Sequence, residues 1–320
     1  MGNDFSDAAP TSGDDTSRTD SCGEHAAPCP TCDDGIQNGK ELRIDCGGGA
    51  CPPCAVCEAP FGPPESISGL GLAGPLAGPA LTSDGLTLFI SEVNGSRADI
   101  HTAERTDRGT VFSEASPVSE LNSPYFDGGP SLTLDGLTLY FYSTRSHPDI
   151  QDLWSAVRTH PTAKFQEPVM LFWVNSDSND ALPTLTHDEA FFMFASDRPE
   201  GEGGYDIWIS RRSTRGDYYE IPTNLIELNT SENETAPAIS GDGLTLFYVT
   251  DRSGGAGDFD IWTASRPDGS ASFEAPTPVA GVNSADAETD VFLSADEREL
   301  VFISTRNGEA ALFRAWRECP

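Results

Sequence analysis

Five segments of the chain repeat one pattern, in which a polar turn built on an aspartate is followed by a short apolar stretch. The segment PALTSDGLTLFIS at 79–91 recurs as PSLTLDGLTLYFYS at 130–143 and PAISGDGLTLFYVT at 237–250, with two more divergent copies at 183–196 and 291–304. The anchoring residues are Asp84, Asp135, Asp188, Asp242 and Asp296. Their spacings of 51, 53, 54 and 54 residues indicate a repeat architecture.

Each repeat contains four short apolar stretches. One starts at the proline, one follows the aspartate turn, one carries Trp or a related side chain, and a weaker one contains Phe-x-x-Pro. Four antiparallel strands recurring at a period of about 50 residues are typical of propeller blades, because one small sheet cannot bury its own apolar surface. We therefore predict an all-β fold, a five-bladed β-propeller of four-stranded blades.

The fifth repeat ends without its fourth strand, and the missing piece lies near the start of the chain. Phe61-Gly62-Pro63-Pro64 copies the motif of Phe273 to Pro276, so we expect an N-terminal strand to complete the last blade. The same alignment places Cys57 and Cys319 at adjacent positions of one hairpin loop. It predicts a Cys57–Cys319 disulfide that locks the ring.

Aromatic residues recur in the third stretch of each repeat. Trp154, Trp208 and Trp262 share one register with His101 and Phe313. Buried aromatic side chains in repeats usually serve packing. We expect these residues to form the core between neighbouring blades.

The excess of acidic residues limits which kinds of partner the protein can bind. With 51 acidic and 19 basic residues, the formal net charge is −32, so a surface that tracks nucleic-acid phosphates is excluded. No run of about 18 apolar residues predicts a membrane span, and no export signal is visible in the first thirty residues. We expect a monomer that works outside the cytoplasm as a periplasmic, outer-membrane or secreted protein, since eight cysteines are typical of oxidising compartments.

Composition divides the chain into three parts. Residues 1–21 have too few apolar side chains to form a core, which predicts a disordered acidic tether; the stretch resembles the linker that follows the lipid-bearing cysteine of bacterial lipoproteins. Residues 22–57 form a Cys-rich module, and residues 58–320 form the propeller.

The Cys-rich module leaves disulfides and metal binding open as alternatives. Its six remaining cysteines are Cys22, Cys29, Cys32, Cys46, Cys51 and Cys54. The spacing of Cys29, Cys32, Cys51 and Cys54 formally fits a zinc ribbon, but the two extra cysteines and the expected oxidising compartment favour disulfides. The oxygen-bearing residues Asp33, Asp34, Asn38, Glu41 and Asp45 offer a set of Ca²⁺ ligands as a third alternative. Otherwise we expect no cofactor.

Two segments resemble known bacterial families. The sequence SGDGLTLFYVTDRSGGAGDFDIW at 240–262 resembles the WD40-like repeat called PD40, found in TolB-type periplasmic propellers and other cell-envelope proteins. The resemblance implies a rigid binding platform, and because TolB-type propellers have six blades, it leaves six blades as the alternative to five. Residues 29–54 resemble a small cysteine module found beside secreted or surface domains, which implies disulfides.

Recurring charged residues predict structural clamps between blades. An Arg follows the second strand of four repeats, whereas repeat 1 has Val93; an Asp opens the third strand of four repeats, whereas repeat 5 has Ala311. Pairing each Arg with the Asp of the preceding blade leaves only these two unmatched positions, both at the ring closure. The expected bidentate pairs are Arg145–Asp99, Arg198–Asp152, Arg252–Asp206 and Arg306–Asp260.

A second set of acids precedes the proline of four repeats by three residues. These are Asp127, Asp180, Glu234 and Glu288, with Leu76 in repeat 1. They are expected on the loop face near the axis, where they either cap local turns or form an acidic mouth for Ca²⁺ or a basic partner.

These patterns favour a non-enzymatic scaffold that binds a protein or glycan partner of the cell envelope through its loop face. The alternative is a carbohydrate-active enzyme, because five-bladed propellers also host glycoside hydrolases. Such enzymes need a pair of carboxylates at a set separation. The inner strands supply mainly Ala, Ser and Thr, so we predict no catalytic residue.

Overall fold

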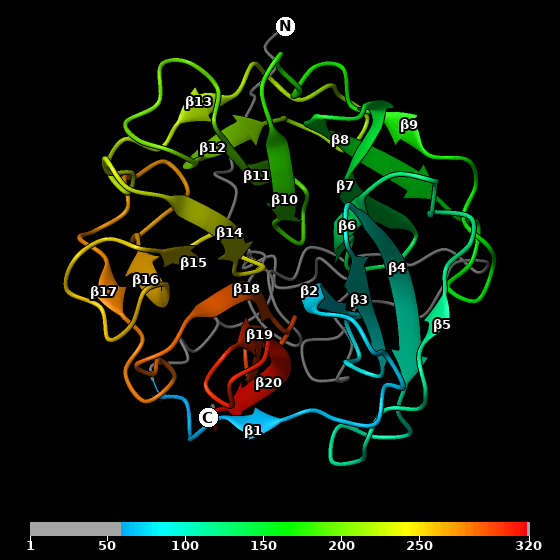
Figure 1. Ribbon diagram of the computed structural model, residues 1–320. Coiled ribbons are helices and arrows are strands. Elements are labelled where there is room, and N and C mark those ends of the chain that lie inside the picture. The colour runs from blue at the N-terminus through cyan, green and yellow to red at the C-terminus, as the bar shows by residue number, and fades with distance from the viewer. Residues whose placement is uncertain (1–58, 319–320) are drawn as a thin grey trace, which may run out of the picture.

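The computed structural model describes residues 59–318, which form twenty strands in five four-stranded antiparallel sheets arranged around a common axis (Figure 1). The prediction of a five-bladed β-propeller is confirmed, and the six-bladed alternative is wrong. Residues 59–318 contain no helix that could span a membrane. The tether, the Cys-rich module and the predicted Cys57–Cys319 disulfide lie outside the described residues.

Each blade contains four strands, which are named below in their order from the axis outward. Blade 1 contains β2 (Leu76–Leu81), β3 (Thr87–Asn94), β4 (Arg97–Glu104) and β5 (Ser116–Pro117). Blade 2 contains β6 (Asp127–Leu132), β7 (Thr138–His147), β8 (Ile150–Val157) and β9 (Val169–Met170). Blade 3 contains β10 (Asp180–Leu185), β11 (Phe191–Ser196), β12 (Asp206–Arg211) and β13 (Thr223–Asn224). Blade 4 contains β14 (Glu234–Ile239), β15 (Thr245–Thr250), β16 (Asp260–Ser265) and β17 (Thr277–Pro278). Blade 5 contains β18 (Glu288–Leu293), β19 (Glu299–Ser304), β20 (Ala311–Trp316) and β1 (Glu65–Ser66).

The anchoring aspartate of each repeat caps the turn between the first two strands. In blade 1, Asp84 Oδ1 accepts a hydrogen bond from Thr82 Oγ1 at 2.6 Å and another from the Leu86 N–H at 2.9 Å. The next residue, Gly85, has φ 72°, a left-handed conformation that glycine adopts at little cost. The same hydroxyl-to-carboxylate bond recurs in all five blades.

A β-bulge is the second feature that recurs in all five blades, and it lies in the innermost strand of each blade. One residue of each inner strand has positive φ, and the strand register shifts at that point. These residues are Gly78, Gly129, Leu182, Ala236 and Asp290. Because the bulges converge on the axis, neighbouring backbones nearly touch there; a Cβ on Gly78 would lie 2.6 Å from the Cα of Gly129.

The predicted aromatic register packs between blades. Trp208 joins Tyr140, Tyr142 and Leu153 of blade 2 in one buried cluster. Trp262 of blade 4 packs with residues of blade 3 such as Met193 and Ile207, and Phe313 contributes to the cluster between blades 4 and 5. Trp154 packs at the edge of the cluster between blades 1 and 2. The Trp residues and Phe313 therefore form inter-blade core, as predicted, whereas His101 joins none of these clusters.

The start of the described chain completes blade 5, as expected. β1 pairs antiparallel with β20, the last strand of the chain. The Gly62 N–H donates to the Trp316 carbonyl at 2.6 Å and the Ile67 N–H to the Leu312 carbonyl at 2.8 Å. Phe61 is buried in the cluster between blades 4 and 5. In Figure 1, β1 lies beside β20 at the seam of the ring.

Candidate functional site

The four arginines that follow the second strands pair with the loop-face acids of their own blades. The nitrogen-to-oxygen distances are 2.6 Å for Arg145–Asp127, 2.5 Å for Arg198–Asp180, 3.1 Å for Arg252–Glu234 and 2.9 Å for Arg306–Glu288. The expected pairs of these arginines with Asp99, Asp152, Asp206 and Asp260 of the preceding blade are therefore wrong. The antiparallel register explains why, since it places Asp127 opposite Ser143, two residues before Arg145.

Each of these arginines still ties its blade to the preceding one, through a backbone carbonyl. Arg145 Nη2 donates to the carbonyl of Leu121, in the connection that arrives from blade 1, and Arg145 Nε donates to Ser143 Oγ. The guanidinium lies 5.1 Å from the ring centres of both Phe141 and Trp154. The arginine is thus held between the blade's aromatic residues and its carboxylate.

The acids of this set do not form an open, cation-attracting mouth. The side chains of Asp127, Asp180, Glu234 and Glu288 are all 0% exposed. A carboxylate that has lost its hydration needs an opposite charge nearby, and here the arginine supplies it. Each acid also binds its own connecting loop, as Asp127 does when its Oδ2 accepts the Ser123 N–H at 2.5 Å. The four acids therefore serve as structural anchors.

The aspartates that open the third strands organise the adjacent loops. Asp206 Oδ2 accepts the Glu202 N–H at 2.8 Å, and Asp260 Oδ2 accepts the Ala256 N–H at 2.7 Å. Asp152 Oδ2 instead accepts a hydrogen bond from the Ser146 hydroxyl. Burial raises the pKa of Asp206 and of Asp152, and the nearby Asp180 carboxylate of the next blade raises that of Asp152 further.

Blade 1 has Leu76 where the other blades have a loop-face acid, and a carboxylate on the neighbouring strand binds its connecting loop instead. The register pairs Leu76 with Glu92, so Glu92 stands where blade 2 has Ser143. Glu92 Oε1 accepts the N–H groups of Ala73 and Gly74, both at 2.8 Å. These bonds, led by that of Gly74, lower the pKa of Glu92. The register also corrects the sequence analysis, because Asn94 rather than Val93 occupies the arginine position of blade 1.

The propeller axis is nearly filled. Two cavities, of about 50 and 30 Å³, are lined by residues from all five inner strands, most of them Ala, Pro, Ser, Thr, Val and Leu. Asp290 is the single carboxylate that lines them, and burial raises its pKa. Among the described residues, the two axial cavities are therefore not lined by a pair of carboxylates.

A further arginine motif, which the sequence analysis missed, recurs in all five blades. The arginine at the end of each third strand donates its Nε to a carbonyl of the aspartate turn and lies over the aromatic residue of the Phe-x-x-Pro stretch. The pairs are Arg105–Phe112, Arg158–Phe165, Arg212–Tyr219, Arg266–Phe273 and Arg317–Phe61, with the guanidinium carbon 4.5–4.6 Å from the ring centre. The signal was present in the sequence, because an arginine ends all five third-strand segments.

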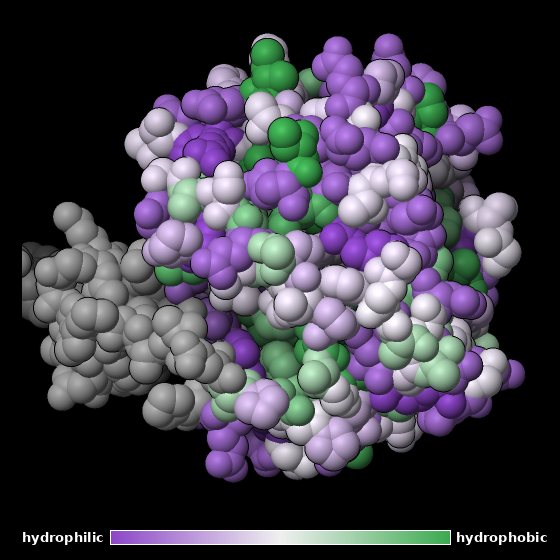
Figure 2. Space-filling model, turned by 90° about the vertical axis from the view of Figure 1, so that its left-hand side faces the viewer, coloured by the Kyte–Doolittle hydropathy of each residue, from purple (hydrophilic) through white to green (hydrophobic). Residues whose placement is uncertain are grey.

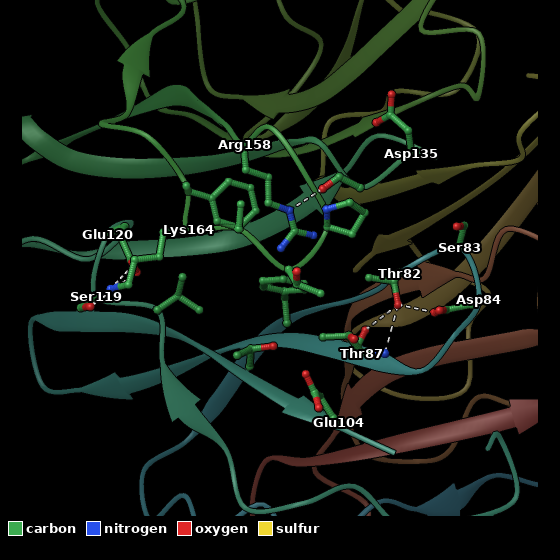
Figure 3. Close-up of a pocket in the computed structure, with 18 of the residues that line it drawn as sticks. Thr82, Ser83, Asp84, Thr87, Glu104, Ser119, Glu120, Asp135, Arg158 and Lys164 are labelled. Atoms are coloured by element: carbon green, nitrogen blue, oxygen red, sulfur yellow. Dashed lines mark hydrogen bonds and ion pairs between the residues drawn. The ribbon is translucent and has the colours of Figure 1, made fainter. Parts of the chain in front are cut away.

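A groove of about 610 Å³ lies between blades 1 and 2 (Figure 3). Thr87, Thr102 and Glu104 line it from the sheet of blade 1, and Arg158 and the loop 161–165 line it from blade 2. Figure 3 shows Arg158 and Glu104 on opposite sides of this groove. Burial lowers the pKa of Arg158, which marks the guanidinium as partly dehydrated.

Six exposed apolar side chains lie in or near the outermost strands of blades 2 and 3, and we call this set the aromatic rim. Its members are Val169, Phe172, Trp173, Tyr218, Ile221 and Ile226. The rings of Trp173 and Tyr218 contact each other across the two blades, with their centres 5.6 Å apart. A second groove, of about 560 Å³ and lined by His147, Asp152 and Met170, adjoins Phe172.

No protein-family model and no curated protein sequence matches this chain. Among solved structures, the catalytic domain of a GH62 α-L-arabinofuranosidase from Coprinopsis cinerea is similar with a TM-score of 0.54 at 10% identity, covering 81% of this chain and 96% of that one. An α-L-arabinofuranosidase from Podospora anserina gives 0.52 at 12% identity, covering 82% and 98%. TolB from Acinetobacter baumannii gives 0.46 at 16% identity and covers 76% of this chain, which spans 54% of the TolB structure. The two arabinofuranosidase likenesses show the propeller fold alone.

Proposed function

We propose that this protein is a non-enzymatic binding propeller that works outside the cytoplasm and engages a protein of the cell envelope. The observation that carries the proposal is the aromatic rim. It contains six of the nine large hydrophobic side chains that are exposed in residues 59–318. Trp and Tyr are enriched at the centres of protein interfaces, where they dominate the binding free energy.

The charge of the chain restricts which partner the rim can bind. A net charge of −32 opposes self-association and opposes binding to an anionic membrane surface. Acidic residues also adjoin the rim in sequence: Glu167 lies two residues before Val169, and Asp217 and Glu220 directly precede Tyr218 and Ile221. The face shown in Figure 2, over blade 4, is mostly hydrophilic with separate hydrophobic side chains. We therefore infer a protein partner that offers apolar side chains within a basic surface.

The binding experiment compares the rim with an exposed apolar residue elsewhere. The wild-type chain, the double variant Trp173→Ala/Tyr218→Ala and the control Val111→Ser are immobilised and exposed to envelope extract. Val111 is as exposed as Tyr218 but lies in blade 1. The protein retained by wild type is then purified and titrated against all three chains.

We expect the double variant to weaken this direct binding at least tenfold, about 1.4 kcal/mol, and the control to leave it unchanged. Equal affinity for all three chains would contradict the proposal. Retention of an envelope polysaccharide in place of a protein, lost in the double variant, would assign the rim to a glycan instead.

A glycoside hydrolase is the second candidate function. The similar arabinofuranosidase folds and the buried Asp290 on the axis favour it. Against it, glycoside hydrolysis uses two carboxylates about 5–9.5 Å apart, and the axial cavities offer one. Turnover of aryl arabinofuranosides by wild type but not by Asp290→Asn would establish the hydrolase and overturn the non-enzymatic proposal.

A further inference from the structure

The groove between blades 1 and 2 contains an arginine whose terminal amino groups have no partner among the described residues. Arg158 Nε donates to the Gly136 carbonyl at 2.7 Å, and its guanidinium carbon lies 4.5 Å from the ring centre of Phe165. Within residues 59–318, neither Nη1 nor Nη2 takes part in a hydrogen bond or an ion pair. The side chain is thus held in place while its two-pronged end faces the groove.

The neighbouring seam, between blades 5 and 1, shows what such an arginine binds. Arg105 has the same Nε bond, to Gly85, and the same aromatic contact, with Phe112. Its Nη1 and Nη2 donate to the two carboxylate oxygens of Glu299 at 3.3 and 2.7 Å, in a pair that is completely buried. The protein therefore fills this copy of the site with a carboxylate of the preceding blade, whereas the equivalent Arg212 and Arg317 pair with Glu189 and Glu297 of their own blades.

The sequence explains why the second copy is open. Glu299 lies three residues after its turn aspartate, Asp296, and the equivalent residue after Asp84 is Thr87. A threonine side chain is too short to reach the arginine as a glutamate does. The bidentate acceptor that Arg105 receives from the preceding blade is missing for Arg158.

A carboxylate faces the same groove from the other side. Glu104 is exposed at the end of β4, and its carboxylate has no hydrogen bond or ion pair within the described chain. It does not pair with Arg158, so the space between them is open to a ligand (Figure 3). The groove's other basic side chain, Lys164, is already paired with Glu120 at 2.5 Å.

We propose that this groove binds a small zwitterion of the amino-acid type. The ligand carboxylate accepts both Arg158 amino groups, as Glu299 does for Arg105, and the ligand ammonium lies toward Glu104. A bidentate arginine–carboxylate contact is strong and directional. The groove is lined by four acidic residues and two basic ones, which disfavours a phosphate or a polyanion. Its volume lies within the range of about 300–1,000 Å³ typical of small-molecule sites.

The free amino acid and the end of a peptide offer the same chemistry, and the titration separates them. The probes are lysine, Nα-acetyl-lysine, lysinamide and the dipeptide glycyl-lysine, each titrated calorimetrically into the full chain. Lysinamide lacks the carboxylate, and we expect it to bind at least tenfold more weakly than lysine. Acetylation removes the α-ammonium that faces Glu104, and we expect a similar loss for Nα-acetyl-lysine. Tighter binding of glycyl-lysine than of lysine would assign the site to peptide ends, and the reverse order to free amino acids.

Three variants connect the binding to these residues. Thr87→Glu supplies an internal carboxylate at the Glu299 position, so we expect it to abolish binding and raise Tm. Arg158→Gln removes the charge and the bidentate donor, whereas Glu104→Gln weakens only the probes with a free α-ammonium. Arg97 lies in blade 1, as Glu104 does, but outside the groove. Arg97→Gln therefore serves as the control, and we expect it to leave binding unchanged.

The proposal does not depend on the aromatic rim, which lies along blades 2 and 3 and shares no residue with the groove. It is overturned if no probe binds at 10 mM, or if Thr87→Glu binds lysine as wild type does.

Discussion

Arg317 lies over the ring of Phe61, with its guanidinium carbon 4.6 Å from the ring centre, although the two residues are at opposite ends of the described chain. In the other four blades the same contact joins residues of one continuous segment. Blade 5 thus has the same arginine–aromatic unit as every other blade, but its two halves come from the two ends. This contact and the pairing of β1 with β20 close the ring.

Replacing Phe61 by Ala should open this seam. Phe61 is 7% exposed and packs edge-on against Phe247, with the ring centres 5.9 Å apart. We expect Phe61→Ala to lower the free energy of unfolding by about 3–5 kcal/mol, the usual cost of removing a buried Phe side chain. Denaturant unfolding measures it. The control is Phe172→Ala, which removes a ring that is 74% exposed and should cost under about 1 kcal/mol. Equal losses would contradict a closed ring.

Removing one of the four arginines that pair with the loop-face acids should leave a buried carboxylate without a partner. Glu234 is fully buried, and Arg252 lies 3.1 Å from it. We expect Arg252→Gln to cost about 3–5 kcal/mol of unfolding free energy, and the double variant with Glu234→Gln to regain a large part of that loss. Lys164→Gln breaks a pair whose lysine is 82% exposed and should cost less than about 1 kcal/mol. A double variant no more stable than the single one would rule out this explanation.

The buried Asp206 should make stability depend on pH in an unusual direction. Burial raises its pKa in the folded state, so the folded protein holds this proton at pH values where the unfolded chain, with an aspartate pKa of about 3.9, has lost it. The contribution of Asp206 to stability therefore falls as pH rises from about 4 through the folded-state pKa. We expect Asp206→Asn to remove this decline, measured as unfolding free energy between pH 4 and pH 7.

The matched control for that measurement is Asp268. Hydrogen bonds led by the Ser270 hydroxyl lower the pKa of this exposed carboxylate. Its contribution is present above the unfolded-state pKa and is lost as pH falls through the folded-state pKa, so Asp268→Asn should change the pH dependence in the opposite sense, in unfolding free energies measured below about pH 4. The same sign of change for both variants would refute the assignment.

A methyl group at the axis should be poorly tolerated. Gly78 has φ 54°, and an added Cβ would lie 2.6 Å from the Cα of Gly129. We expect Gly78→Ala to cost about 1–2 kcal/mol for the left-handed conformation and a further 1–3 kcal/mol or so for overpacking. Gly95 has φ 67° but no atom within 4 Å of its Cβ position, so Gly95→Ala should show the first cost alone. Equal losses of thermal stability for Gly78→Ala and Gly95→Ala would contradict the close approach of neighbouring backbones at the axis.

The arginines show where sequence reasoning worked and where it stopped. The shared period of arginines and aspartates predicted charge pairs, and the gaps at Val93 and Ala311 favoured Asp99 as the partner of Arg145. Asp127 recurs with the same period, so spacing alone does not distinguish the two partners. The choice depends on the antiparallel register, which brings Asp127 opposite Ser143. The arginine–aromatic contacts likewise depend on how the outermost strand packs, which brings Phe112 under Arg105 and Phe61 under Arg317.

By itself, the sequence determined the five repeats, the four strands of each, the aspartate-capped turns and the completion of blade 5 by Phe61. These features depend on local conformational preference and on a period that the chain displays directly. The tertiary structure alone decided which charges meet, how completely the axis is filled, and that Thr87 leaves Arg158 without the carboxylate that Arg105 receives. Those features depend on which side chains face each other across two separately formed sheets, and that follows from packing rather than from spacing along the chain.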